Sequence, residues 1–264
     1  MGLTSQSSGI NVLRESFNLN TEKKNPIIAL AGNPNTGKST VFNELTGLKQ
    51  HTGNWPGKTV TRAQGYYLYH NNKYTVVDLP GTYSLLSNST EEKISRDFIC
   101  FAKPDVTLIV TDATNLERNL NLVIQITELT DNVIMCLNFM DEVKKKNFSI
   151  DIKGLIKDLG IPVVPTIARE DKGINELEQY IEDIINNNII IKPEKISYSK
   201  KIEDRITKLI PALKKQYVEL VNYLNFRWLA LRYLEGDNKI FETIDKLKQN
   251  LIIQNNNPDV KGEL

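Results

Sequence analysis

The hydrophobic positions of this chain follow two alternating patterns between Pro26 and residue 188. Short continuous apolar runs are typical of buried parallel strands. They occur at 26–31, 76–79, 106–110, 133–137 and 163–167. Between these runs, apolar residues recur every three or four positions, which predicts helices. These stretches are 39–47, 90–101, 117–130, 150–159 and 174–186. Strands alternating with helices predict an α/β fold with a mostly parallel, doubly wound sheet.

One pair of runs interrupts this alternation. Tyr66–Tyr69 and Tyr74–Val77 flank the turn-rich segment 70–73, which predicts a hairpin. We expect this hairpin to add one antiparallel edge strand to the sheet.

After residue 188 no further strand is evident, and the pattern becomes helical. One apolar face consists of Ile202, Ile206, Leu209, Leu213, Tyr217, Leu220 and Leu224. Pro211 interrupts this face and is expected to kink the helix or to begin a new one. Further helices are expected over 226–234 and 238–253. The chain therefore divides into an α/β domain (26–188) and a small all-helical domain (189–264), after a polar segment (1–25) that we expect to be flexible.

Composition narrows the class of protein. The 264 residues include 33 basic and 32 acidic side chains, so the net charge of +1 gives no general attraction to nucleic acid or anionic membrane. No apolar run approaches the roughly 20 residues of a membrane span, and the beginning lacks the apolar core of a signal peptide. Cys100 and Cys136 lie in apolar runs and read as buried thiols. The chain as given is expected to be soluble, in a reducing compartment.

Residues 32–39 carry the clearest chemistry, because they match the phosphate-binding pattern G-x-x-x-x-G-K-[ST] between a predicted strand and a predicted helix. We expect Lys38 to reach the β- and γ-phosphates and Ser39 to ligate Mg²⁺. A chance glycine-rich turn is the alternative, and the flanking elements disfavour it. The residues expected to hold the nucleotide here are Gly32, Asn33, Pro34, Asn35, Thr36, Gly37, Lys38, Ser39 and Thr40.

A second motif, Asp78-Leu79-Pro80-Gly81, ends another predicted strand. We expect Asp78 to hold Mg²⁺ through water and the Gly81 N–H to contact the γ-phosphate. D-x-x-G is common in turns, so its place on a strand after the phosphate-binding loop is what favours the functional interpretation.

A third motif, Asn138-Phe139-Met140-Asp141, follows the strand 133–137. The Asp141 carboxylate can accept from guanine N1–H and the exocyclic amine together, a donor pair that adenine lacks. We expect Asn138 to contact the base and to tie the surrounding loops together, although N-x-x-D could also be a helix cap. Thr166 and Ala168 end the last strand, where the Ala168 N–H is expected to contact guanine O6. An ATP site would make Asn138 and Asp141 coincidental.

The order and spacing of these motifs resemble a Ras-like, TRAFAC-class P-loop GTPase domain over residues 26–186. Two positions depart from the usual pattern. Phe139 stands where Lys is usual, so an aromatic ring replaces the aliphatic stem that lies along the base. Ile167 stands where Ser is usual, which puts a side-chain hydrogen bond in doubt but not the backbone contact.

The resemblance implies a threonine that ligates Mg²⁺ when GTP is bound, and Thr59 is our choice, with Thr61 the runner-up. It lies in the segment 53–60, Gly-Asn-Trp-Pro-Gly-Lys-Thr-Val. We take Trp55 to be an exposed loop residue, and a hydrophobic anchor for the loop is the alternative. Together with 32–39, this segment and the stretches 78–85, 112–120 and 227–237 are similar to the ferrous iron transport protein B family.

This family resemblance implies a GTPase that turns GTP into GDP and phosphate, with switches at 48–62 and 80–92. It implies a helical domain like a GDP-dissociation inhibitor, on the cytoplasmic face of the prokaryotic inner membrane. It further implies a membrane-embedded transporter domain of the same protein that carries Fe²⁺, whose uptake the nucleotide regulates. No nucleic-acid partner is expected, and a homo-oligomer is left open. The alternatives are a free-standing GTPase acting on RNA or ribosome assembly, and a docking module with incidental hydrolysis.

Slow hydrolysis is expected because Thr82 follows Gly81, where Ras-like proteins have the glutamine that orients water. The resemblance implies that K⁺ compensates, ligated by Asn35 and by the carbonyls of Gly53 and Trp55. A turn-forming role is the alternative for Asn35. The expected catalytic set is Asn35, Lys38, Thr59 and Gly81. The Lys58 ammonium either weakens the need for K⁺ or lies in solvent.

Overall fold

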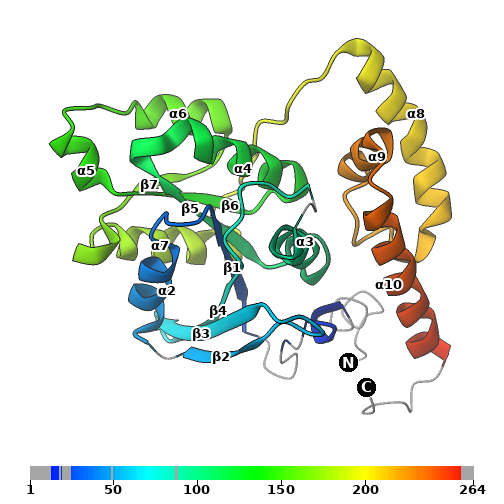
Figure 1. Cartoon of the computed structure of the whole chain (residues 1–264), viewed down its shortest axis with the longest axis horizontal. Helices are drawn as coiled ribbons and strands as arrows, with labels where there is room; N and C mark the ends of the chain where they lie inside the picture. The colour runs from blue at the N-terminus through cyan, green and yellow to red at the C-terminus, as the bar shows by residue number, and fades with distance from the viewer. Residues whose placement is uncertain (1–12, 18, 20–24, 49, 87–88, 257–264) are drawn as a thin grey trace. The chain divides into compact units, whose positions relative to one another are not determined.

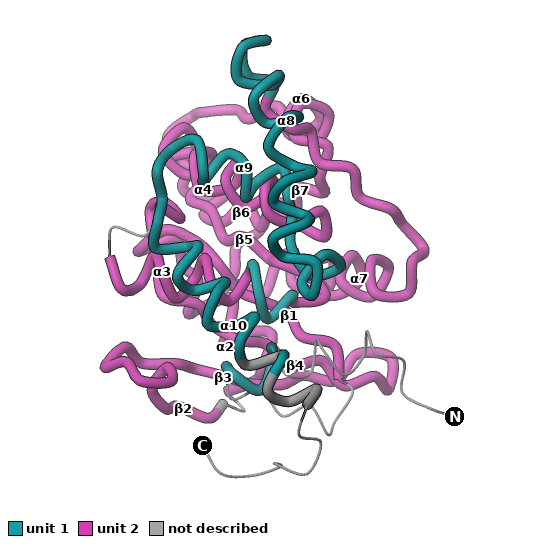
Figure 2. The backbone as a smooth tube through the Cα atoms, turned by 90° about the vertical axis from the view of Figure 1, so that its right-hand side faces the viewer, with its two compact units in different colours: residues 1–21, 100–103, 197–264 teal, residues 22–99, 104–196 magenta. Residues whose placement is uncertain are grey.

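The computed structural model describes residues 13–17, 19, 25–48, 50–86 and 89–256. It divides into two compact units, coloured separately in Figure 2. Unit 2 comprises residues 22–99 and 104–196, and unit 1 comprises 1–21, 100–103 and 197–264. The division between 196 and 197 falls later than the expected 188. The connecting segment stays with unit 2 because the Lys195 ammonium lies 2.8 Å from the Asp131 carboxylate.

Unit 2 is built on a seven-stranded sheet in the order β2-β3-β4-β1-β5-β6-β7. The strands are β1 (Ile27–Gly32), β2 (Gln50–Asn54), β3 (Thr61–Tyr69), β4 (Asn72–Asp78), β5 (Val106–Asp112), β6 (Val133–Asn138) and β7 (Val163–Pro165). Five of them, β4, β1, β5, β6 and β7, run parallel, so the predicted α/β fold with a mostly parallel sheet is confirmed.

The antiparallel side of the sheet differs from the prediction. β3 pairs with β4 as the expected hairpin, but β3 is not the edge strand, because β2 pairs along its other side. The sequence of β2, Gln-His-Thr-Gly-Asn, has no apolar alternation and so gave no strand signal. Its backbone hydrogen bonds to β3, rather than side-chain burial, hold it in the sheet.

Helices cover both faces of the sheet. They are α2 (Lys38–Thr46), α3 (Thr90–Asp97), α4 (Leu116–Leu129), α5 (Met140–Lys145), α6 (Ile152–Leu159) and α7 (Ile174–Ile185). The short α5 is the one that the periodicity did not predict. Figure 1 shows α2 and α7 on one face and α4 and α6 on the other. Alternate residues such as Ile28 and Leu30 of β1 pack in one core with Phe42 of α2 and Leu177 of α7.

Unit 1 is helical in its described C-terminal part, with α8 (Lys200–Gln216), α9 (Phe226–Glu235) and α10 (Asn238–Asn256). Pro211 lies inside α8, so no new helix begins there. Helices α8 and α9 are joined by a bidentate ion pair, with Arg227 Nη1 2.6 Å from Glu203 Oε2 and Nη2 2.9 Å from Oε1.

The described residues 13–17 and 19 of the N-terminal segment belong to unit 1, where they contact the short stretch 100–103. Leu13 is buried, and Arg14 Nη2 donates to the Lys103 carbonyl at 2.8 Å. Residues 1–12, which also belong to the extension expected to be flexible, lie outside the described residues. Across the part of the chain that is described, no helix combines the length and the apolar character that crossing a membrane requires.

Candidate functional site

The phosphate-binding loop connects β1 to α2 with the backbone turned inward. Asn35 and Gly37 adopt left-handed conformations, with φ of 65° and 83°. A Cβ on Gly32 would lie 2.5 Å from the Val110 carbonyl oxygen, so the strand end admits only glycine. The Thr36 hydroxyl donates to the Asn33 carbonyl at 3.0 Å and braces the turn. The first N–H groups of the nine-residue helix α2 therefore open onto this loop, an arrangement suited to an anion.

Asp78 and Gly81 are brought beside this loop, as the sequence predicted. Asp78 ends β4, which pairs with β1, and its carboxylate contacts the Lys38 ammonium. Burial raises the pKa of Asp78 above its usual value, and Lys38 offsets part of that rise. A Cβ on Gly81 would lie 3.3 Å from Pro34 N, so the two loops touch. A partly buried carboxylate whose charged form is destabilised by desolvation fits a further cation near it.

Asn138 links three segments of the site. Its Nδ2 donates to the Thr36 carbonyl at 3.1 Å, and its Oδ1 accepts from the Thr166 hydroxyl at 3.3 Å and the Ala168 N–H at 3.1 Å. All of these bonds are buried, so the loops after β1, β6 and β7 are tied together as expected. The Ala168 N–H was expected to contact guanine O6. In the structure it donates to Asn138, so a base would have to share it.

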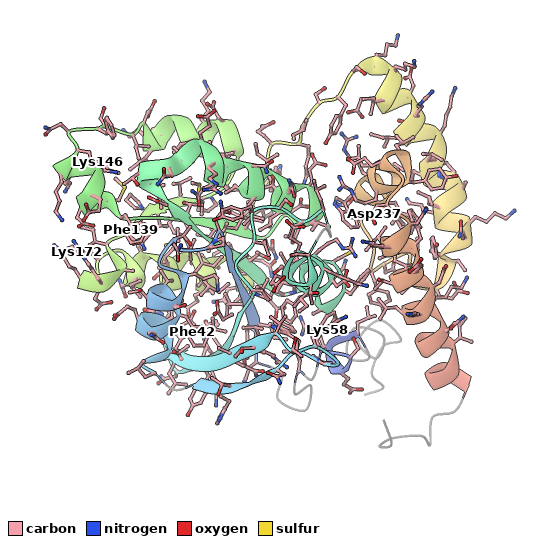
Figure 3. The ribbon with its side chains drawn as sticks, viewed as in Figure 1. Phe42, Lys58, Phe139, Lys146, Lys172 and Asp237 are labelled. Atoms are coloured by element: carbon pink, nitrogen blue, oxygen red, sulfur yellow. The ribbon has the colours of Figure 1, made fainter. Side chains whose placement is uncertain are left out.

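Phe139 is the N-cap residue just before α5 and has a left-handed conformation, with φ of 65°, which is uncommon for an aromatic residue. Its ring edge would lie 3.2 Å from a Cβ on Gly37, so ring and phosphate-binding loop are neighbours (Figure 3).

Asp141 lies in the first turn of α5 and is only 13% exposed. Its Oδ2 contacts the Arg169 guanidinium and lies 3.5 Å from the Lys145 ammonium, whereas its Oδ1 is buried with no hydrogen-bond partner among the described residues. Burial alone would raise the pKa of Asp141. Arg169, a backbone N–H and Lys145 outweigh it and hold the pKa below its usual value. The site therefore presents an ionised acceptor with one unused oxygen.

In the segment 48–62, which was expected to be the first switch, the structure corrects one expectation. Trp55 is 2% exposed rather than an exposed loop residue. Its ring meets Phe98 edge-on at 5.5 Å, and the Arg62 guanidinium lies 5.4 Å from its centre. The alternative interpretation, a hydrophobic anchor for the loop, agrees with this burial. Lys58 is exposed, in accord with a solvent position.

The other expected switch ligands are not assembled with the phosphate-binding loop. Gly53 lies on β2, with β3 and β4 between it and β1, a spacing of roughly 14 Å at about 4.8 Å per strand. The Trp55 carbonyl accepts from the Lys58 N–H at 2.9 Å. Thr59 is exposed in the turn that follows. In Figure 3 Lys58, in the same turn, lies well apart from Phe139.

Sequence reasoning missed Arg169. It lies in a short 3₁₀ turn, Ala168–Glu170, after β7, and reaches Asp141 across 28 residues of sequence. A single arginine beside a loop motif carries no sequence signal of its own, because only the parallel pairing of β6 and β7 brings the two loops together. Among the described residues, the site included, no group of three or more His, Cys, Asp or Glu side chains could hold a metal ion.

Two family models match the chain. The model described as "Ferrous iron transport protein B" matches residues 26–181, and the one described as "FeoB cytosolic helical domain" matches 198–259. The Fe(2+) transporter FeoB of Escherichia coli K12 is 39% identical over 220 residues, which is 80% of this chain and 27% of that protein. The Fe(2+) transport protein A/FeoB fusion protein of Porphyromonas gingivalis is 38% identical over 228 residues, 86% of this chain and 27% of that protein. This chain thus spans about a quarter of the length of these curated relatives.

Solved structures agree. The cytosolic domain of T. maritima FeoB in a GDP form has a TM-score of 0.76 at 38% identity, covering 84% of this chain and 85% of that one. The cytosolic domain of L. pneumophila FeoB has a TM-score of 0.75 at 34% identity, covering 86% and 88%. With the phosphate-binding loop, the D-x-x-G strand end and the N-x-x-D loop converging on one edge of the sheet, the chain belongs to the ferrous iron transport protein B family, and its unit 2 is a G domain of the P-loop GTPase class.

Proposed function

We propose that unit 2 binds GTP and hydrolyses it to GDP and phosphate, and that this cycle regulates Fe²⁺ uptake by a membrane-embedded transporter domain of the same full-length protein. Relatives that are named Fe(2+) transporters support the proposal. So do related cytosolic domains solved in GDP and GMPPNP forms. The chain would then act on the cytoplasmic face of a prokaryotic inner membrane. Membership of this family disfavours the alternative of a free-standing GTPase for RNA or ribosome assembly.

The observation that carries the guanine assignment is the Asp141 carboxylate. It is ionised, nearly buried and fixed beside Asn138, and its Oδ1 has no hydrogen-bond partner among the described residues. Guanine N1–H and its exocyclic amine supply the donors that such an acceptor lacks. Adenine would place a ring-nitrogen acceptor against the carboxylate and leave it unsatisfied, which is costly in a buried site. The Phe139 ring would cover the base.

Ser39, Thr59 and Asp78 would hold Mg²⁺, Asp78 through water, and the bound ion supplies positive charge to the β- and γ-phosphates. Lys38 would exchange its contact with Asp78 for the phosphate oxygens, which leaves the Asp78 carboxylate available to the hydrated ion. The Gly81 N–H would donate to the γ-phosphate. The partly buried Asp78 carboxylate beside the loop is the feature of the structure that fits this metal.

Hydrolysis would be slow, because Thr82 is too short to orient water as glutamine does. Asn35 and the carbonyls of Gly53 and Trp55 would ligate K⁺, which supplies charge where it develops in the transition state. Since the Trp55 carbonyl accepts from the Lys58 N–H, this turn would have to open first. Unit 1 would act as the helical domain that slows GDP release.

Phosphate release from GTP and from ATP, with Mg²⁺, in KCl and in NaCl at equal ionic strength, tests these proposals. We expect turnover of GTP alone, faster in KCl. Equal turnover of ATP would overturn the guanine assignment. GTP turnover that is indifferent to the cation would remove the K⁺ site and leave the GTPase. Tight GTP binding without turnover would favour the docking module.

A further inference from the structure

We propose that Arg169 is a positioning residue for base recognition: it holds one oxygen of Asp141 from the solvent side, so that the other oxygen faces the base. The inference rests on the proposed guanine-nucleotide function and adds to it a specificity determinant outside the motifs. It starts from the unequal surroundings of the two carboxylate oxygens of Asp141.

The geometry separates the roles of these oxygens. Arg169 Nη2 contacts Asp141 Oδ2 and lies 3.6 Å from Glu142 Oε1, so the guanidinium lies between two carboxylates of α5. Asp141 Oδ1 is buried and has no hydrogen-bond partner in the described part of the chain. Rotation about the last torsion of an aspartate is soft and roughly two-fold. A donor fixed on one oxygen therefore sets the plane of the carboxylate and the direction of the other oxygen.

The sequence explains why an extra donor is needed. The usual Ras-like last loop has a serine where this chain has Ile167, and isoleucine cannot donate a hydrogen bond. Lys145, the other side chain near Asp141, is 3.5 Å away and belongs to the same helix. Arg169 comes two residues after Ile167 and brings a donor to Asp141 from the opposite loop.

Hydrogen bonds fix the backbone of that loop beside Asn138. The Ala168 N–H donates to Asn138 Oδ1 at 3.1 Å, and the Ile167 N–H donates to the Lys172 carbonyl at 3.0 Å. Arg169 therefore begins from a fixed point, although its side chain is 55% exposed. Exposed ion pairs contribute little to folding stability. Removal of the guanidinium should leave the fold intact and change base recognition.

Charge reinforces this positioning. The charged groups around Asp141 are the cations Arg169 and Lys145 and the carboxylates Glu142 and Glu170. A bound base would remove the remaining water from Asp141, and desolvation favours the protonated carboxyl. Arg169 opposes that effect from the side that the base leaves open.

The test compares GDP with inosine diphosphate, which lacks the exocyclic amine that a correctly oriented Asp141 reads. Calorimetric titration gives the dissociation constants of both nucleotides for the wild type and for Arg169→Gln. We expect the wild type to prefer GDP over inosine diphosphate. In Arg169→Gln this preference should be roughly tenfold smaller, which corresponds to the loss of one charge-assisted hydrogen bond. Arg169→Lys should restore part of the preference. The affinity of Arg169→Gln for GDP should also fall more steeply than that of the wild type toward about pH 5.

Lys172→Gln is the matched control, because it removes one positive charge from the same loop. Lys172 is 66% exposed and pairs with Glu170 at 2.7 Å rather than with Asp141. If Lys172→Gln lowers the GDP preference as much as Arg169→Gln does, the effect is loop charge and the positioning role is wrong. An unchanged preference in Arg169→Gln, or an equal loss of both nucleotides, overturns it as well. A wild type that binds neither nucleotide refutes the proposed function instead.

Discussion

The loops proposed to recognise the base and the segment proposed as the first switch are held in different ways. Asn138 joins the loops after β1, β6 and β7 through buried hydrogen bonds, so the base side is assembled in the structure as it stands. The switch turn 55–60 lies beside the outermost strand, held by one buried tryptophan and two backbone bonds. Under the proposed function, the groups that recognise base and phosphate would be assembled in advance, whereas sensing of the γ-phosphate would require the turn 55–60 to move.

The contacts of Trp55 suit a switch that opens. Its indole Nε1 is buried without a hydrogen-bond partner among the described residues, so part of the gain from burial is lost. Burial also lowers the pKa of Arg62, the cation beside the ring, because the charged form is poorly solvated there. Packing of the ring favours the buried position of Trp55. The unpaired indole Nε1 and the poorly solvated Arg62 cation oppose it.

The largest effect should come from Lys38→Ala, on the assembled side of the site. Loss of the ammonium removes a charge-assisted contact to the phosphates, and GTP affinity should fall about 100-fold. Titration with a non-hydrolysable GTP analogue measures this loss. Lys93→Ala, in α3, is a charge-matched control that should bind normally. Undiminished binding by Lys38→Ala would mean that this loop does not hold the phosphates.

Asp141→Asn should change the preferred base from guanine to xanthine. The new amide can donate to the oxygen that xanthine has in place of the exocyclic amine of guanine. GTP affinity should fall about 30-fold while XTP affinity rises, as expected for losing a charged hydrogen bond. Competition binding with both nucleotides checks the exchange. Asp131→Asn, at an exposed carboxylate away from these motifs, is the control. Wild-type preference in Asp141→Asn would refute the base-reading assignment.

A smaller effect, measured by fluorescence, is expected from the turn 55–60. Trp228→Phe leaves Trp55 as the only tryptophan of the chain. Its emission should shift to longer wavelength when a non-hydrolysable GTP analogue binds, because we expect the ring to leave its buried position as Thr59 moves to Mg²⁺. GDP should cause no such shift. The reciprocal variant Trp55→Phe reports Trp228 alone and should stay unchanged. A Trp55 emission that ignores the analogue would show that the turn opens without releasing the ring.

The smallest effect on nucleotide binding should follow from the Arg227–Glu203 ion pair of unit 1. Hydrogen bonds from Arg227 and the Tyr198 N–H lower the pKa of Glu203 to about 2 from 4.5. A lowered carboxyl pKa stabilises the fold above the unfolded value, and this stability is lost as pH falls from about 4.5 toward 2. In Arg227→Gln that acid-dependent loss should shrink, as urea unfolding at several pH values would show. GDP affinity should not change, in contrast to Arg169→Gln.

The motifs could be read from the sequence because their chemistry is local. The spacing of Gly32, Gly37 and Lys38 specifies a turn before a helix, and the apolar runs before Asp78 and Asn138 place both at strand ends. Parallel strands bring their carboxyl ends to one edge of a sheet, so convergence followed from the α/β pattern. The family resemblance rested on the same local motifs, and the family model and the relatives that match this chain confirm it.

What only the tertiary structure decided depends on contacts between distant segments. β2 is polar and exists because β3 offers it backbone partners. Trp55 lies in a sequence typical of an exposed loop and is buried because Phe98, 43 positions later, packs against its ring. Arg169 became a candidate only when its contact with Asp141 was visible. The sequence by itself determined the elements and the motif chemistry, because backbone turns and periodicity are local. The fold decided which lone side chains meet, because pairing energy depends on neighbours that sequence order does not specify.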